Sequence, residues 1–309
     1  MITTIFKKST PINYSLIGIL IVVFFLLQQN YVVLSELSTP KLLSKISYLV
    51  ILFTSFFAID FITKRNGLSK DNGFTVFFYL LFLLFFPSIF NNLNLLIANF
   101  CILLSMRRLI SLQTLKFPKE KIFDASFWIF VATLFHFWSI IFIILVFISI
   151  LFHVGRDYRN WVLPFIAFIS VALLFVLFAL LVDENLIFDF INKIQISFEF
   201  YYFKSIYQNI AFSLFIMIAF FFISALILSL SNRPLLLNSS YKKILFWLFL
   251  GLVVFMLSPE KSNEILIFTF SPLAIMASSF IEITELKWQR EFTFCTVILC
   301  GIFCFFTQL

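Results

Sequence analysis

Three side chains of this sequence stand out as candidates for acid–base chemistry: Glu36, His136 and Glu264. Each lies beside or between long apolar stretches. A carboxylate or an imidazole can take or give a proton, provided that it lies within hydrogen-bond reach of the reacting group. We treat the three as catalytic candidates. A single histidine at a membrane surface also serves as an ordinary interfacial polar residue, and that interpretation of His136 stays open.

A second set of charged residues lies near the ends of apolar stretches. It comprises Asp60, Arg107, Arg108, Asp124, Arg156 and Arg159. Because the guanidinium fork matches the geometry of phosphate, the set predicts a site for an anionic lipid head group. The alternative is structural, since an acid at a helix start complements the helix dipole and arginines anchor helix ends at a membrane surface.

The sequence predicts neither a metal centre nor a cofactor site. Its two histidines, His136 and His153, are expected on opposite faces of the membrane, so a multi-histidine iron site is excluded. Nucleotide-binding loops of the Gly-x-x-x-x-Gly-Lys type and nucleophile motifs of the Gly-x-Ser-x-Gly type do not occur. The cysteines lie inside apolar segments and are expected to act as small hydrophobes; they are Cys101, Cys295, Cys300 and Cys304.

The elements that carry these residues are predicted to be membrane-spanning helices. Of the 309 residues, 62% are hydrophobic and 12% charged, and the mean hydropathy is +1.08. Soluble domains are about 45–50% apolar and about 25% charged, because polar side chains must cover their exterior. We therefore expect an all-α polytopic transmembrane helix bundle that forms a single domain over residues 1–309.

A span needs roughly 20 helical residues. Eleven apolar segments are assigned as spans: 13–28, 44–63, 74–90, 93–106, 122–135, 138–154, 162–182, 207–230, 244–258, 263–283 and 291–308. The stretch 122–154 is divided at the polar interruption 136–139, where the alternative is one long tilted helix.

The basic residues predict the orientation of the bundle. Lys and Arg concentrate in cytoplasmic loops. With the N-terminus inside, 17 of the 22 basic residues fall in inside loops and five outside, so we predict an N-in, C-out topology. The net charge of +7 is explained by these clusters, and nucleic acid is not expected as a partner. The outside loop 183–206 alternates apolar and charged residues, which predicts an amphipathic segment in the membrane interface.

Several motifs give the whole chain a resemblance to a family of polytopic inner-membrane proteins of Bacteroidota. They are Phe6-Lys7-Lys8-Ser9, Asn92-Leu93-Asn94-Leu95-Leu96, Arg107-Arg108-Leu109-Ile110-Ser111-Leu112 and Lys121-Ile122-Phe123-Asp124. The resemblance implies the inner, cytoplasmic membrane of a bacterium as the location, but it implies no particular activity.

About a third of the chain resembles the polytopic glycosyltransferases that use polyprenyl-phosphate sugars, the GT-C class. The similar stretches are 123–164, with its two short helices and Pro164, and 259–273, with Glu260, Glu264 and Pro272. That class places a catalytic Asp in the first outside loop, whereas the loop 29–44 offers only Glu36. The resemblance therefore implies a GT-C-like organisation without the usual first-loop Asp.

These observations lead to one leading functional hypothesis and two alternatives. The first is a protein of envelope assembly that handles a lipid-linked glycan or a lipid head group, as a divergent or a non-catalytic GT-C-like protein. Its partners would be membrane lipids, including a polyprenyl-phosphate-linked sugar. The alternatives are a non-enzymatic subunit or scaffold that holds partner membrane proteins of a secretion, motility or other envelope complex, and a transporter. Against a transporter stand the lack of internal repeats and of mid-membrane charges.

Overall fold

The computed structural model describes residues 2–30, 39–192, 194–195, 205–231, 233–259 and 261–309, and these contain helices and no β-strand. The α-helices are α1 (Ile2–Ile5), α2 (Pro11–Asn30), α3 (Thr39–Arg65), α4 (Phe74–Leu84), α5 (Leu93–Ser111), α6 (Pro118–Phe135), α7 (Ile143–His153), α8 (Arg159–Val182), α9 (Asn185–Asn192), α10 (Ile206–Leu230), α11 (Leu235–Leu257), α12 (Ile267–Ile283) and α13 (Lys287–Gln308). Short 3₁₀ helices are η1 (Pro87–Asn91), η2 (Leu112–Thr114), η3 (Phe137–Phe142) and η4 (Asn263–Leu266).

Eight helices of the described chain are long and apolar enough to cross a membrane: α2, α3, α5, α8, α10, α11, α13 and the η4–α12 unit. The remaining predicted spans fall on α4, on α6 and on the η3–α7 unit. The first and last of these are shorter apolar helices, and α6 carries four charged residues in its first two turns. The all-helical fold is thus confirmed, with eight helices that suit a multi-pass membrane protein, while the count of eleven crossings and the topology stay predictions.

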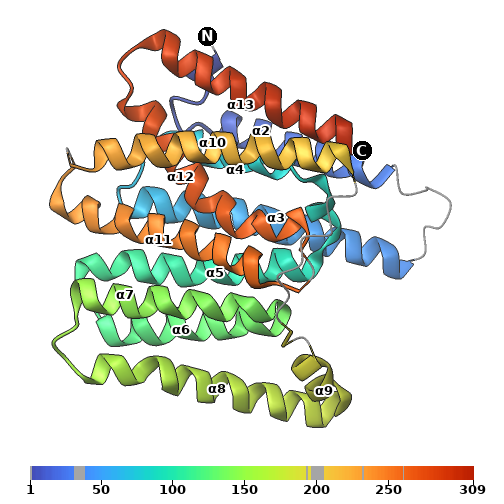
Figure 1. The fold of residues 1–309 in the computed structure, drawn as a ribbon, viewed down its shortest axis with the longest axis vertical. Coiled ribbons are helices and arrows are strands. Elements are labelled where there is room, and N and C mark those ends of the chain that lie inside the picture. Colours follow the sequence, from blue (N-terminus) through green and yellow to red (C-terminus); the bar gives the residue numbers. More distant parts are fainter. Residues whose placement is uncertain (1, 31–38, 193, 196–204, 232, 260) are drawn as a thin grey trace.

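The helices lie side by side as one bundle, with α8 at one edge and α13 at the other (Figure 1). Its centre is formed by α4 and α12: every residue of α4 is buried, as is 89% of the most apolar window of Asn263–Ile283. Only 17% of the corresponding window of α8 is buried, although α8 is apolar on all sides, and Leu181 is 85% exposed. Such an exterior is stable in lipid and not in water.

Polar contacts between neighbouring helices fix the centre of the bundle. The hydroxyl of Tyr79 on α4 accepts a hydrogen bond of 2.9 Å from the Asn99 amide on α5, and the Thr75 and Ser278 hydroxyls join α4 to α12 at 2.9 Å. All four side chains are buried. In a lipid-embedded bundle such hydrogen bonds specify which helices pair, because an apolar surface alone discriminates poorly between helix and lipid.

The bundle has two polar ends. The "basic end" contains the junctions α3–α4, α5–α6, α7–α8, α10–α11 and α12–α13. Contacts between them include the pairs Gln113–Asn66, Ser240–Gln113, Lys119–Asp157 and Asn72–Glu282. The "opposite end" contains η1, η3, η4 and α9. At the basic end the backbone N–H of Ser9 donates to Asp71, whereas Gln308 donates to the Phe85 carbonyl at the opposite end. The two termini therefore lie at opposite ends (Figure 1).

The 17 basic residues of the predicted inside set lie toward the basic end: Lys7 and Lys8 precede α2, and the others lie in its junctions or in the first or last turns of the adjoining helices, with Lys242 and Lys243 in the third turn of α11. Lys45 and Lys261, from the predicted outside set, lie toward the opposite end. One member of the inside set behaves differently from a loop residue: Lys243 is fully buried within α11, and its Nζ donates to the Leu109 carbonyl at 2.6 Å. Which end faces the cytoplasm stays a prediction.

The stretch 122–154 divides where the sequence predicts. Helix α6 ends at Phe135, His136 is extended with φ −139° and ψ 106°, and η3 follows directly. The predicted interfacial segment 183–206 contains α9, none of whose side chains is buried; residues 193 and 196–204 of that segment lie outside the described residues.

Candidate functional site

The opposite end of the bundle contains a pocket of about 450 Å³, which we call the amide-rich pocket. It lies between the start of α5, the α6–η3 junction, the end of α9 and the segment that joins α11 to η4. Its polar lining residues are Asn92, Asn94, His136, Asn192, Gln195, Ser258 and Ser262. The rest of its wall is apolar and includes Phe135, Phe137 and Trp138. Among the described residues that line it, none is Lys, Arg, Asp or Glu.

Asn92 is held in one orientation from both sides. Its Nδ2 donates a hydrogen bond to Glu264 Oε2 at 2.8 Å, and its Oδ1 accepts one from the Leu95 backbone N–H at 3.3 Å. The second contact caps the start of α5, as expected for Asn at an N-cap. Glu264, on η4, thereby orients the Asn92 amide without lining the pocket itself.

His136 enters the pocket from the break between α6 and η3. Its ring lies against Phe268, with the centroids 5.6 Å apart, and its Nε2 is buried without a hydrogen-bond partner among the described residues. Burial lowers the pKa of His136 to about 4, so the imidazole is neutral at pH 7. A neutral imidazole has one donor and one acceptor nitrogen, and it can bond to a ligand hydroxyl in either sense.

Helix α9 closes one side of the pocket. The Phe190 ring on α9 contacts Phe137 on η3, with centroids 5.8 Å apart, and Trp138 Nε1 donates to the Gln195 carbonyl at 3.2 Å. These contacts hold the amphipathic helix across the α6–η3 junction. Asn192, at the end of α9, is thereby brought to the pocket although the chain runs 100 residues from Asn92 to Asn192.

The residues of the predicted head-group cluster lie at the basic end in separate groups. Asp60 and Arg107 line a pocket of about 770 Å³ between α3 and α5, where the Arg107 guanidinium lies 4.8 Å from the centroid of the Phe61 ring. Arg108 instead pairs with Asp124 at 2.8 Å, joining α5 to α6. The positions of these residues in the sequence do not predict this division, because it depends on the rotation of each helix about its axis.

Arg156 and Arg159 lie at the α7–α8 junction. The Arg159 guanidinium is 5.9 Å from the Tyr158 ring, and the neighbouring Asp157 pairs with Lys119 at 3.5 Å. In the described part of the chain, no hydrogen bond or ion pair joins this junction to Arg107, Arg108 or Asp60. The six residues therefore share an end of the bundle but do not converge on one ligand position.

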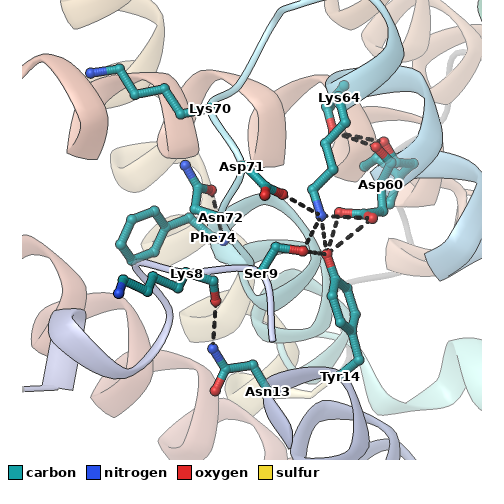
Figure 2. Close-up of polar contacts among 12 residues, drawn as sticks. Lys8, Ser9, Asn13, Tyr14, Asp60, Lys64, Lys70, Asp71, Asn72 and Phe74 are labelled. Atoms are coloured by element: carbon teal, nitrogen blue, oxygen red, sulfur yellow. Dashed lines mark hydrogen bonds and ion pairs between the residues drawn. The ribbon is translucent and has the colours of Figure 1, made fainter. Parts of the chain in front are cut away.

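Asp60 is engaged by the protein itself (Figure 2). The Tyr14 hydroxyl donates to both Asp60 carboxylate oxygens at 3.0 Å, and Lys64 Nζ lies 3.1 Å from Asp60 Oδ2. Lys64 also contacts the Tyr14 hydroxyl and donates to Ser9 Oγ at 2.8 Å. The network ties the segment before α2 to the end of α3, and this structural role leaves Asp60 few lone pairs for a ligand.

Glu36 and the possible metal ligands complete the set of candidate residues. Glu36 lies outside the described residues. Among the described residues no group of three His, Cys, Asp or Glu side chains is arranged to hold a metal ion.

Comparison of the chain with protein-family models, curated proteins and solved structures finds no match. The resemblances described above therefore stay predictions.

Sequence reasoning identified only His136 among the polar residues of the amide-rich pocket. The other six are Asn, Gln and Ser residues that the sequence did not single out as site residues. The sequence did contain one indication of this pocket, because the predicted topology puts all the loops that carry these residues on the same face of the membrane. Their convergence on one pocket, however, depends on the packing of η3, η4 and α9.

Proposed function

We propose that this chain is a multi-pass membrane protein that binds the sugar-bearing head group of a membrane lipid in the amide-rich pocket. A single observation carries the proposal. A pocket of about 450 Å³ at one end of an apolar bundle is lined by amide, hydroxyl and imidazole groups beside aromatic rings, and among its described lining residues none is charged.

The chemistry of the lining favours a polyol. Each sugar hydroxyl is both a donor and an acceptor, and Asn and Gln side chains present both functions on one rigid plane. A neutral ligand avoids the large free-energy cost of desolvating an unpaired charge in such a site. The rings of Phe137 and Trp138 give the pocket an apolar wall against which the C–H face of a sugar ring can pack.

The surroundings of the pocket favour a ligand that is anchored in lipid. Apolar helices with largely exposed side chains form the exterior of the bundle, and α9 is an amphipathic helix at the same end as the pocket. A glycolipid or polyprenyl-linked glycan would keep its hydrocarbon in the bilayer while the head group enters from the membrane surface. This agrees with a role in envelope assembly at a bacterial inner membrane.

The state of the candidate acid–base groups favours binding over catalysis. With a pKa of about 4, His136 is a weak base at pH 7. Glu264 is occupied by the Asn92 amide and does not line the pocket. We therefore propose a protein that holds or presents the head group, related in function to the glycosyltransferases by its ligand and not by its chemistry.

Native mass spectrometry of the protein in mild detergent tests the proposal. The double variant Asn94→Leu/Asn192→Leu removes two exposed amides from the pocket, whereas Gln289→Leu removes an amide on α13 at the basic end. Two lost hydrogen bonds of about 0.5–1.5 kcal/mol each should reduce the occupancy of a glycolipid about tenfold. We expect a glycolipid adduct on the wild type and on Gln289→Leu. An adduct retained in full by the double variant would contradict the proposal.

A further inference from the structure

A second pocket, of about 470 Å³, lies at the basic end, and we call it the basic pocket. It lies between α1, the α3–α4 loop and the α12–α13 junction. Four cationic side chains line it: Lys7, Lys70, Lys287 and Arg290. None of them belongs to the cluster that the sequence predicted as a head-group site, and the proposed sugar pocket is at the other end of the bundle.

Both acids of the basic pocket accept hydrogen bonds from neutral groups of the protein. Glu282 Oε1 accepts hydrogen bonds from the Lys70 backbone N–H at 3.1 Å and from Asn72 Nδ2 at 2.6 Å. Glu291 accepts hydrogen bonds from the backbone N–H of Thr3, at 3.3 Å, and from its hydroxyl. Within the described part of the chain, no ion pair joins Glu282 to the four cations.

The pocket therefore carries an excess of two positive charges, from four cations and two acids. Lys7, Lys70 and Lys287 are exposed, whereas Arg290 is half-buried. The Nε of Arg290 is buried and has no hydrogen-bond partner among the described residues. A buried donor of this kind destabilises the fold unless an acceptor reaches it, so the Arg290 guanidinium keeps an unused hydrogen-bond donor beside the pocket.

The wall that carries Lys70 is fixed in place by the contacts in Figure 2. The Ser9 backbone N–H donates to the Asp71 carbonyl at 3.2 Å, and Lys64 Nζ lies 3.7 Å from Asp71 Oδ1. Asp71 is thus turned toward Lys64, while Lys70 extends away from the Lys64–Asp60 pair (Figure 2). The loop separates its adjacent acid and base, and it presents only the base to the pocket.

We infer that the basic pocket binds a phosphate group. A phosphate dianion balances the excess of two positive charges and can accept from a guanidinium and several ammonium groups together. The pocket lies at an end of the bundle, where water and lipid head groups meet. The phosphate can therefore be a free phosphate in solution or the phosphate of an anionic lipid. The inference does not rest on the proposed sugar pocket, because no residue is shared between the two.

Binding measurements on matched variants test the inference. Lys70→Gln/Lys287→Gln removes two exposed cations of the pocket, and Lys70→Arg/Lys287→Arg keeps both charges. Lys116→Gln/Lys242→Gln removes two exposed cations at the same end but outside the pocket. Each protein is titrated with inorganic phosphate in neutral detergent at constant ionic strength. Each is also reconstituted in nanodiscs of phosphatidylcholine with and without phosphatidic acid, and the melting temperature is recorded.

We expect inorganic phosphate or phosphatidic acid to stabilise the wild type. The Lys116→Gln/Lys242→Gln and Arg variants should bind within about twofold of wild type, and Lys70→Gln/Lys287→Gln at least about tenfold more weakly. A response to phosphate in detergent identifies a soluble ligand, and a response to phosphatidic acid alone identifies a lipid. The inference is overturned if neither probe stabilises the wild type, or if the two Gln variants lose binding equally.

Discussion

Asn92 and Glu264 are 172 positions apart in the sequence, yet the Asn92 amide donates to the Glu264 carboxylate across 2.8 Å. This contact joins the start of α5 to η4 beside the amide-rich pocket, which Asn92 lines. Because Asn92 also caps α5, one side chain couples the start of a central helix to the shape of the pocket.

Removing this contact should destabilise the bundle. Asn92→Ala loses both the cap and the link to Glu264, and we expect a loss of about 1–2 kcal/mol in the free energy of unfolding. Glu264→Ala should cost less, because the cap remains. In a double-mutant cycle measured by chemical unfolding in detergent, the two changes should show a coupling of at least about 0.5 kcal/mol. Strict additivity would mean that the contact does not hold the two elements together.

The low pKa of His136 predicts a loss of stability in mild acid. In the unfolded chain its pKa is about 6.5, and in the fold it is about 4, so the unfolded state binds more protons between these values. The contribution of neutral His136 to the free energy of unfolding is therefore complete above pH 6.5. It falls as the pH is lowered toward 4 and changes no further below that value. Melting temperatures of the wild type and His136→Gln should converge across this range as the pH decreases. Parallel curves would show that His136 is not buried in its neutral form.

Some parts of the fold could be predicted from the sequence because they depend on local properties. Apolar length and composition place the helices, and the polar residues at 136–139 mark the break between α6 and η3. The basic residues mark one end of the bundle because a charge is costly in the centre of a membrane. Lys243 departs from the loop positions expected for that set, since its ammonium group bonds to the Leu109 carbonyl inside the bundle.

The sites could not be predicted in the same way, because they depend on helix rotation and on contacts between distant segments. Arg107 and Arg108 are neighbours in sequence, yet one lies over the Phe61 ring and the other pairs with Asp124. The basic pocket likewise combines Lys7 and Lys70 with residues near the start of α13. Only the packing of α1, the α3–α4 loop and α13 brings them together.

Gly251 of α11 packs tightly against α12, and this contact predicts that the position does not tolerate a larger side chain. A Cβ at Gly251 would lie 2.9 Å from Thr269 Cγ2 and 3.3 Å from the Phe268 carbonyl oxygen, so Gly251→Ala must separate the two helices. We expect a loss of about 1–3 kcal/mol, measured as a lower melting temperature in detergent. Gly18→Ala is the matched control, because its Cβ would meet only the Phe53 ring, which can move. Equal effects at the two glycines would contradict this packing.

The network around Lys64 predicts how firmly the segment before α2 is attached. Asp60 and Lys64 side chains are 19% and 24% exposed, so Lys64→Met leaves a largely covered carboxylate with the Tyr14 hydroxyl. We expect a local loss of about 1–3 kcal/mol and faster trypsin cleavage after Lys7 and Lys8. Arg65→Met changes the next residue, which is exposed, and should leave the cleavage rate unchanged. If Lys64→Met is cleaved no faster than Arg65→Met, the network does not anchor the segment.

The account depends most on the placement of the two ends of the bundle on opposite sides of a membrane, and cysteine labelling measures this directly. Asn192→Cys places a thiol beside the amide-rich pocket, and Lys116→Cys places one at the basic end; both positions are exposed. The wild type, whose cysteines at 101 and 304 are buried, provides the background. With a membrane-impermeant maleimide, we predict labelling of Asn192→Cys in intact cells and of Lys116→Cys only after permeabilisation. Labelling of Lys116→Cys in intact cells would contradict the account.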